Sequence, residues 1–113
     1  MENLEGAICL ISLPQSDGKQ KIRPVLLLKK FPPFNDYLVC GISSQIHQFV
    51  KGFDELLDFQ SPEFEMTGLR ESSVIRLGFL SMIEKNKIPG VIGRISNQLL
   101  HSLLSRLANY LTT

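Results

Sequence analysis

Short apolar runs separated by polar, turn-forming residues make up the first part of the chain. The first run covers residues 7–13 and ends at the polar segment PQSDGK, and the second covers residues 23–30. FPPFND then interrupts the chain before a third run over residues 37–44. Runs of this length bounded by Pro, Gly, Asp and Ser are typical of β-strands. We therefore predict three strands within the first 45 residues, the first two forming a hairpin-like pair.

The pattern is less regular in the middle of the chain. FDELLDF fits either a short strand or a turn of helix, and we predict a strand over residues 53–58. QSPEFEMTGLRESS contains a proline and a glycine, and we predict a loop there. Residues 73–83 combine β-branched and aromatic side chains around Gly78, which indicates two short strands or one strand with a bulge. A further short strand is predicted over residues 88–95.

A helical period replaces the strand pattern in SNQLLHSLLSRLANYL, near the end of the chain. Ser96 precedes the pattern and is a favoured N-cap residue type. Apolar residues recur every three or four positions and form one broad face, which we expect to pack on the sheet. The fold class predicted is mainly β with a C-terminal helix, as a small barrel-like or strongly curved antiparallel sheet. The apolar face consists of Leu99, Leu100, Leu103, Leu104, Leu107, Tyr110 and Leu111.

Length and composition are those of one folded domain, which we predict over residues 1–113. Apolar residues make up 43% of the chain and charged residues 20%, which excludes a disordered tail. No apolar run approaches the roughly 20 residues needed to span a bilayer. Glu2 and Glu5 stand where a signal peptide would carry positive charge. We therefore predict a cytoplasmic protein that does not associate with a membrane.

Metal and redox chemistry are not indicated. Cys9 and Cys40 lie inside apolar runs, so we predict buried free thiols. His47 and His101 have no metal-ligand spacing with each other or with the cysteines, and we predict no metal and no cofactor. The formal net charge is +1, so binding to nucleic acid would have to rest on a local patch of cations.

Several segments, taken in order, have counterparts in one known family. EGAICLISL is similar to the opening strand of that family, and KIRPVLLL to its Arg-Pro-Val strand after a flexible loop. GISSQ, SSVIRLGFLSMIEK and GVIGRIS match later segments, followed by the Leu-rich helix. The set resembles the MazF/PemK-like toxins of bacterial type II toxin-antitoxin systems. The resemblance implies an SH3-like barrel with a C-terminal helix, a homodimer, an antitoxin protein as partner, and metal-independent cleavage of single-stranded RNA.

The resemblance also implies catalytic residues. Arg23 matches the active-site arginine before proline, and its guanidinium can bind two phosphate oxygens at once. Ser43 matches a Thr or Ser at a strand end, where the hydroxyl would bind a phosphate or a 2′-oxygen. Arg76 matches an arginine that some members use. Other interpretations are open: Arg23 could be a surface residue paired with Asp17 or a glutamate, Arg76 a surface or interface residue, and Ser43 with Ser44 a simple turn.

Further residues are candidates for substrate binding. Lys19 and Lys21 belong to a run of cations around one hairpin that could guide RNA phosphates, although such a run is also common on a solvated face. Ser44, Gln45 and His47 follow the predicted third strand. His47 could also act as a general base near neutral pH, or be an ordinary exposed loop histidine. Aromatic residues available for base stacking are Phe31, Phe34, Phe49 and Phe53.

Two positions depart from the family pattern. Ala7 stands where an aspartate is usual after the first-strand glycine, and Gly78 stands where some members have an aspartate two residues after Arg76. Candidate general bases are therefore scarce. The leading hypothesis is an endoribonuclease toxin that uses 2′-hydroxyl attack. The alternative is a catalytically degenerate binding protein on the same fold, which binds RNA, an antitoxin or a protein target, as the gyrase-directed toxins do.

Overall fold

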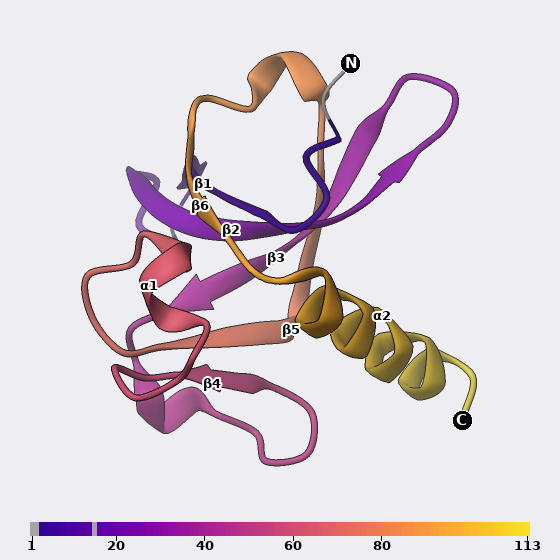
Figure 1. The fold of residues 1–113 in the computed structure, drawn as a ribbon. Coiled ribbons are helices and arrows are strands. Elements are labelled where there is room, and N and C mark those ends of the chain that lie inside the picture. Colours follow the sequence, from indigo (N-terminus) through magenta and orange to yellow (C-terminus); the bar gives the residue numbers. More distant parts are fainter. Residues whose placement is uncertain (1–2, 15) are drawn as a thin grey trace.

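The computed structural model describes residues 3–14 and 16–113 and contains one antiparallel sheet (Figure 1). The six strands follow the order β4-β5-β3-β2-β1-β6 and curl into a half-barrel. The prediction of a mainly β fold with a curved antiparallel sheet is confirmed. The strands are β1 (Ala7–Pro14), β2 (Gln20–Phe31), β3 (Asp36–Ser43), β4 (Glu55–Leu57), β5 (Ser73–Ile83) and β6 (Val91–Arg94).

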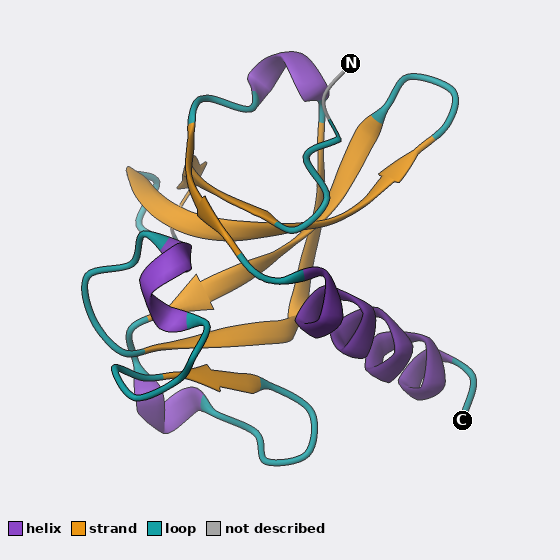
Figure 2. Cartoon of the chain, in the orientation of Figure 1, coloured by secondary structure: helices purple, strands orange, loops and turns teal. Residues whose placement is uncertain are grey.

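Helices occupy the connections and the end of the chain (Figure 2). The predicted C-terminal helix is present, and Ser96 is its N-cap, since the Ser96 Oγ accepts a hydrogen bond from the Leu99 N–H at 3.1 Å. Among the described residues, no helix is long and apolar enough to cross a membrane. The helical elements are η1 (Ile46–Gln48), α1 (Phe64–Thr67), η2 (Lys85–Lys87) and α2 (Asn97–Leu111).

Helix α1 corrects the prediction of a loop in this part of the chain. The turn is held by residues distant in sequence: the Glu63 carboxylate accepts hydrogen bonds from the Ser96 N–H and hydroxyl, at the start of α2. Gly68 ends α1 with φ of +74°. A Cβ at Gly68 would collide with the Ile92 carbonyl, and one at Gly93 would collide with the Thr67 backbone. Two glycines therefore let α1 and β6 approach closely.

Strand β5 is a single strand with an irregular register against β3. Cys40 faces Leu80, whereas the next residue, Gly41, faces Arg76. Three residues of β5 thus lie between two consecutive pairs. Of the two predicted alternatives, two short strands or one strand with a bulge, the structure has the second. Bulges redirect side chains, and this one lies beside the site described below.

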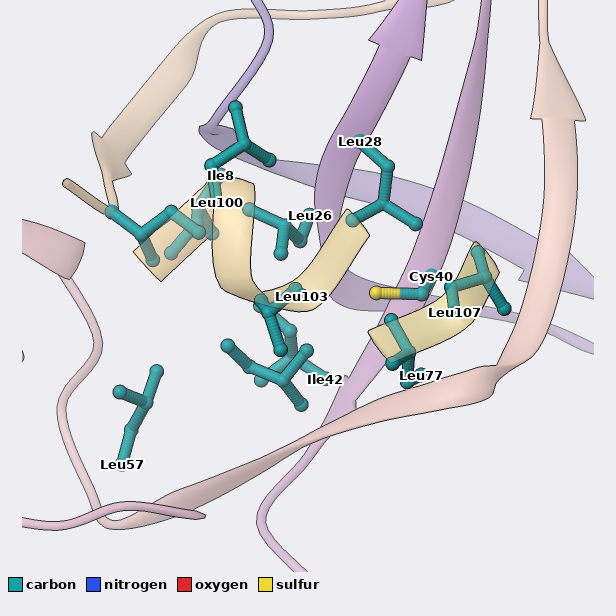
Figure 3. Close-up of a cluster of buried hydrophobic side chains, with 12 residues drawn as sticks. Ile8, Leu26, Leu28, Cys40, Ile42, Leu57, Leu77, Leu100, Leu103 and Leu107 are labelled. Atoms are coloured by element: carbon teal, nitrogen blue, oxygen red, sulfur yellow. The ribbon is translucent and has the colours of Figure 1, made fainter. Parts of the chain in front are cut away.

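The sheet is apolar on both faces over most of its length. Leu100, Leu103 and Leu107 point from α2 toward the side chains of β1, β2, β3 and β5 (Figure 3). A second cluster includes Cys9, and both cysteines are buried and free, as predicted. Burial raises the pKa of the Cys40 thiol to about 12, with a further contribution from the Asp54 charge. Cys40 is therefore an unreactive core residue.

Glu5 ties the N-terminal segment to the end of β2. Its Oε2 accepts a hydrogen bond from the Lys30 N–H at 2.9 Å and lies 3.7 Å from the Lys29 Nζ. Burial raises the pKa of the Glu5 carboxyl, but the hydrogen bonds from Lys30 and Asn3 and the charges of Lys29 and Lys30 outweigh it. The net result is a pKa below the ordinary value.

Glu5→Gln should therefore lower the free energy of unfolding by about 1 kcal/mol at neutral pH, because it weakens a charge-assisted hydrogen bond. Since the folded pKa is lowered, this contribution is complete above the ordinary pKa of 4.5 and is lost as pH falls through the folded pKa. Urea denaturation of the unmodified protein and of Glu5→Gln between pH 3 and 7 should give unfolding free energies that converge in acid. A difference in unfolding free energy that does not change with pH would contradict this interpretation of Glu5.

Candidate functional site

A pocket of about 520 Å³ lies at one end of the sheet, where β2, β3 and β5 meet the loop around η1. Its lining is unusual for this molecule because it is mostly polar and carries positive charge. Three cations, three uncharged polar residues and four apolar or glycine residues line it. They are Lys21, Arg23 and Arg76; Ser43, Gln45 and Gln48; and Pro24, Gly41, Ile42 and Phe79.

The strand register explains how these residues come together. Val25 of β2 faces Gly41 of β3, and Gly41 faces Arg76 of β5, so the three form one row across the sheet. Arg23 and Ser43 lie two residues further along β2 and β3, and side chains two residues apart share a face of the sheet. Gly41 has no side chain, and the ring of Phe79 takes the place that one would need. The pocket lies at this row of the sheet.

The cations of the pocket are not neutralised by neighbouring carboxylates. Arg23 and Arg76 are half-buried and Lys21 is exposed. Among residues 3–14 and 16–113, three ion pairs form and none includes a pocket cation. The interpretation of Arg23 as a surface partner of Asp17 finds no support there. An arrangement of unpaired, half-buried guanidinium groups is suited to binding an anion such as phosphate. The ion pairs are Lys29–Glu5, Lys87–Glu84 and Arg106–Glu55.

Ser43 both shapes the chain and presents a donor. Its Oγ accepts a hydrogen bond from the Gln45 N–H at 3.0 Å, which turns the chain after β3. The hydroxyl proton is left to donate to a ligand oxygen. Gln45 thereby reaches the pocket lining. The two functions proposed for this serine, turning the chain and donating a hydrogen bond, are compatible.

The remaining sequence candidates lie outside the lining. Lys19 is exposed in the loop before β2, Ser44 is exposed after β3, and His47 is exposed on η1. Their substrate contacts stay predictions. In the part of the chain that the structure describes, no three His, Cys, Asp or Glu side chains come together as a metal site would require.

Two lining residues with polar or aromatic side chains, Gln48 and Phe79, were not selected in the sequence analysis. Gln48 follows the candidate His47 on η1, and its Oε1 is buried without a hydrogen-bond partner. Phe79 is the aromatic residue of the lining, whereas none of the four phenylalanines selected from the sequence for base stacking lines the pocket. Gly78, directly before Phe79, indicated a bulge from the sequence alone. The direction of the Phe79 ring could not be predicted, because it depends on the register of β5 against β3.

Neither of the two positions that depart from the family pattern lines the pocket. A Cβ at Gly78 would be 3.3 Å from the Phe53 Cε2, so a side chain there would meet Phe53. Ala7 is buried and pairs with Arg94 of β6, at the other side of the sheet. A Cβ at Gly78 therefore faces Phe53, which does not line the pocket.

A buried carboxylate supports the pocket without lining it. The Asp54 Oδ1 accepts a hydrogen bond from the Leu77 N–H at 3.1 Å, and its Oδ2 accepts one from the Val50 N–H at 3.0 Å. Both oxygens therefore hold backbone groups, one of them in the residue directly after Arg76. We interpret Asp54 as a positioning residue for the start of the β5 bulge.

Comparison with protein families agrees with this geometry. Residues 4–111 match the family described as PemK-like, MazF-like toxin of type II toxin-antitoxin system. The matched range contains all six strands, α2 and every residue that lines the pocket. A search of curated proteins gives no match.

Proposed function

The chain belongs to the family of PemK-like, MazF-like toxins of type II toxin-antitoxin systems, and from this premise we propose that it cleaves single-stranded RNA in the pocket between β2, β3 and β5. One observation carries the proposal. Two half-buried arginines, Arg23 and Arg76, line the same pocket and have no ion-pair partner among the described residues. A phosphate of a flexible single strand fits that space and charge.

The proposed reaction uses the 2′-hydroxyl of the substrate as nucleophile. Its oxygen attacks the adjacent phosphorus while the bond from phosphorus to the 5′-oxygen breaks. The 2′-hydroxyl loses its proton and the leaving oxygen gains one, which gives a 2′,3′-cyclic phosphate and a 5′-hydroxyl. Arg23 and Arg76 stabilise the added negative charge of the phosphorane-like transition state, and Ser43 donates to a phosphate oxygen. No step requires a metal ion.

Cleavage of a single-stranded RNA by the purified protein in EDTA tests the proposal. We expect fragments with cyclic phosphate and 5′-hydroxyl ends. A single 2′-deoxynucleotide on the 5′ side of the cleaved bond should block cleavage there, because it removes the nucleophile. Intact RNA at micromolar protein, with a known ribonuclease active in the same buffer, would refute the proposal. Cleavage that survives the deoxy substitution would refute the mechanism.

One observation favours the alternative of a binding protein without catalysis. Among the described residues, no carboxylate and no histidine lines the pocket. Such a protein would bind RNA at the same arginines, or arrest growth through a protein target. Expression of the chain in bacteria separates the two: growth arrest with RNA decay supports the ribonuclease, and arrest with intact RNA supports the alternative.

The partners follow from the family and from the proposal. A toxin of a type II system has an antitoxin protein as its partner. We propose in addition that the chain forms a homodimer and works in the cytoplasm, as the resemblance implies. Light scattering coupled to size-exclusion chromatography would measure the mass of the assembly directly.

A further inference from the structure

Phe79 lies over the floor of the pocket and is not part of the core. Its side chain is 54% exposed. A Cβ at Gly41 would collide with the Phe79 Cδ2 and lie 3.1 Å from its Cε2, so the ring occupies the space that a side chain at position 41 would need. The absence of a side chain at Gly41 thus allows a large aromatic group at the centre of the pocket.

Arg76 packs on the same ring. Its Cζ lies 5.1 Å from the centroid of the Phe79 ring, which is the range of cation–π contacts. Phe79 therefore orients the guanidinium of Arg76, while the N–H groups of Arg76 remain available for a phosphate or a base edge. This pairing depends on the bulge, of which Phe79 is part. Residues three apart in a regular strand point to opposite faces, yet Arg76 and Phe79 line one pocket.

An exposed apolar side chain is common on protein surfaces and needs no special explanation by itself. Phe79 differs because it stands among three cations and three polar residues in a concave site. A phosphate itself makes no stacking contact with an aromatic ring. Single-stranded nucleic acid offers both parts of a matching ligand, a phosphate for the cations and a flat base for the ring.

We propose that Phe79 is a stacking platform for one base of the substrate. Arg76 packs on its ring and directs its N–H groups to the phosphate that Arg23 and Ser43 also bind. This inference rests on the proposed function, because it names what the same pocket recognises. Gly41 and Ser43 lie two residues apart on β3, about 7 Å at the usual rise per residue. A nucleotide spans this distance from its phosphate to its base. The ring holds the base by stacking, so any of the four bases is accepted.

Binding of a non-cleavable strand tests the platform without catalysis. The probe is a fluorescein-labelled oligonucleotide with 2′-O-methyl riboses, followed by fluorescence anisotropy. Phe79→Leu should raise Kd about tenfold, because it keeps an apolar side chain but removes the aromatic face. Phe79→Tyr should stay within twofold of the unmodified protein. Phe34→Leu is the matched control, since Phe34 is 79% exposed in the turn after β2 and lies outside the lining.

An abasic nucleotide placed at successive positions of the probe locates the stacked base. One position should weaken binding to the unmodified protein about tenfold and have no effect on Phe79→Leu, since the two changes remove the same contact. Gly41→Ala should also raise the Kd for the probe, because the added Cβ displaces the Phe79 ring. Thermal denaturation of each variant reports whether the fold is kept.

The outcomes separate the platform from the ribonuclease. If Phe79→Leu binds as tightly as the unmodified protein, or if the unmodified protein binds no oligonucleotide, the platform is wrong, and cleavage in EDTA still decides the function. If the unmodified protein binds with the predicted dependence on Phe79 but cleaves no natural RNA, the platform stands and the ribonuclease is wrong. If it cleaves, Phe79→Leu should raise KM, and kcat should fall as well because Phe79 orients the guanidinium of Arg76.

Discussion

Replacing Arg23 with alanine is expected to lower kcat/KM for cleavage of single-stranded RNA by about a thousandfold, with little change in Tm. In the proposed mechanism the guanidinium stabilises charge that develops on the phosphate in the transition state, and one such donor contributes about 10²–10³ in rate. The fold should tolerate the change because Arg23 is half-buried near the start of β2 and belongs to neither apolar cluster. Initial rates in EDTA measure the effect.

Two further variants make this result specific. Arg23→Lys keeps the positive charge but loses the paired N–H groups, so its kcat/KM should lie between those of the alanine variant and the unmodified protein. Arg70→Ala is the matched control, because Arg70 is exposed in the loop before β5 and lies outside the pocket lining. Full activity of Arg23→Ala would remove Arg23 from the mechanism. A fall in Tm that parallels the loss of activity would indicate a structural function instead.

Replacing Gly93 with alanine is expected to lower the free energy of unfolding by about 3 kcal/mol, because the new methyl group must displace a backbone. The added Cβ would collide with the carbonyl group of Thr67, at the end of α1. A backbone segment moves less easily than a side chain. Loss of this contact would separate α1 from β6.

Gly90→Ala provides the matched control for Gly93→Ala. It lies just before the same strand, has no atom within 4 Å of the position of an added Cβ, and does not require a positive φ. Its unfolding free energy should equal that of the unmodified protein or exceed it slightly, because alanine restricts the unfolded chain. Urea denaturation of both variants decides the matter, and equal midpoints would mean that α1 and β6 are not closely packed.

Most of the fold could be predicted from local patterns. The apolar run over residues 7–13 lies in β1, residues 37–43 of the third run lie in β3 with Ser44 just after it, and the leucine period after Ser96 lies in α2. These patterns are informative because an element buries one face, and its period follows from backbone geometry alone. Helix α1 could not be predicted in this way. It is a single turn, and Glu63 anchors it to Ser96, 33 residues away.

The candidate site could be predicted in part. Arg23 and Ser43 were selected from motifs, and the alternation of side chains along β2 and β3 places them on one face. Their catalytic function remains a proposal. Phe79 could not be selected, because its position over Gly41 requires the three-residue shift between β3 and β5. Gln48 likewise reaches the pocket through the turn that follows Ser43.

The sequence by itself was enough to place the strands and the amphipathic helix and to select Arg23, before Pro24, as a site candidate. Each of these inferences depends only on neighbours within a few residues. The tertiary structure decided which cations share a pocket, which aromatic ring lies among them, and that positions 7 and 78 lie outside it. Those features depend on strand register and on a bulge. Register is set by contacts between segments far apart in the chain, which no local pattern contains.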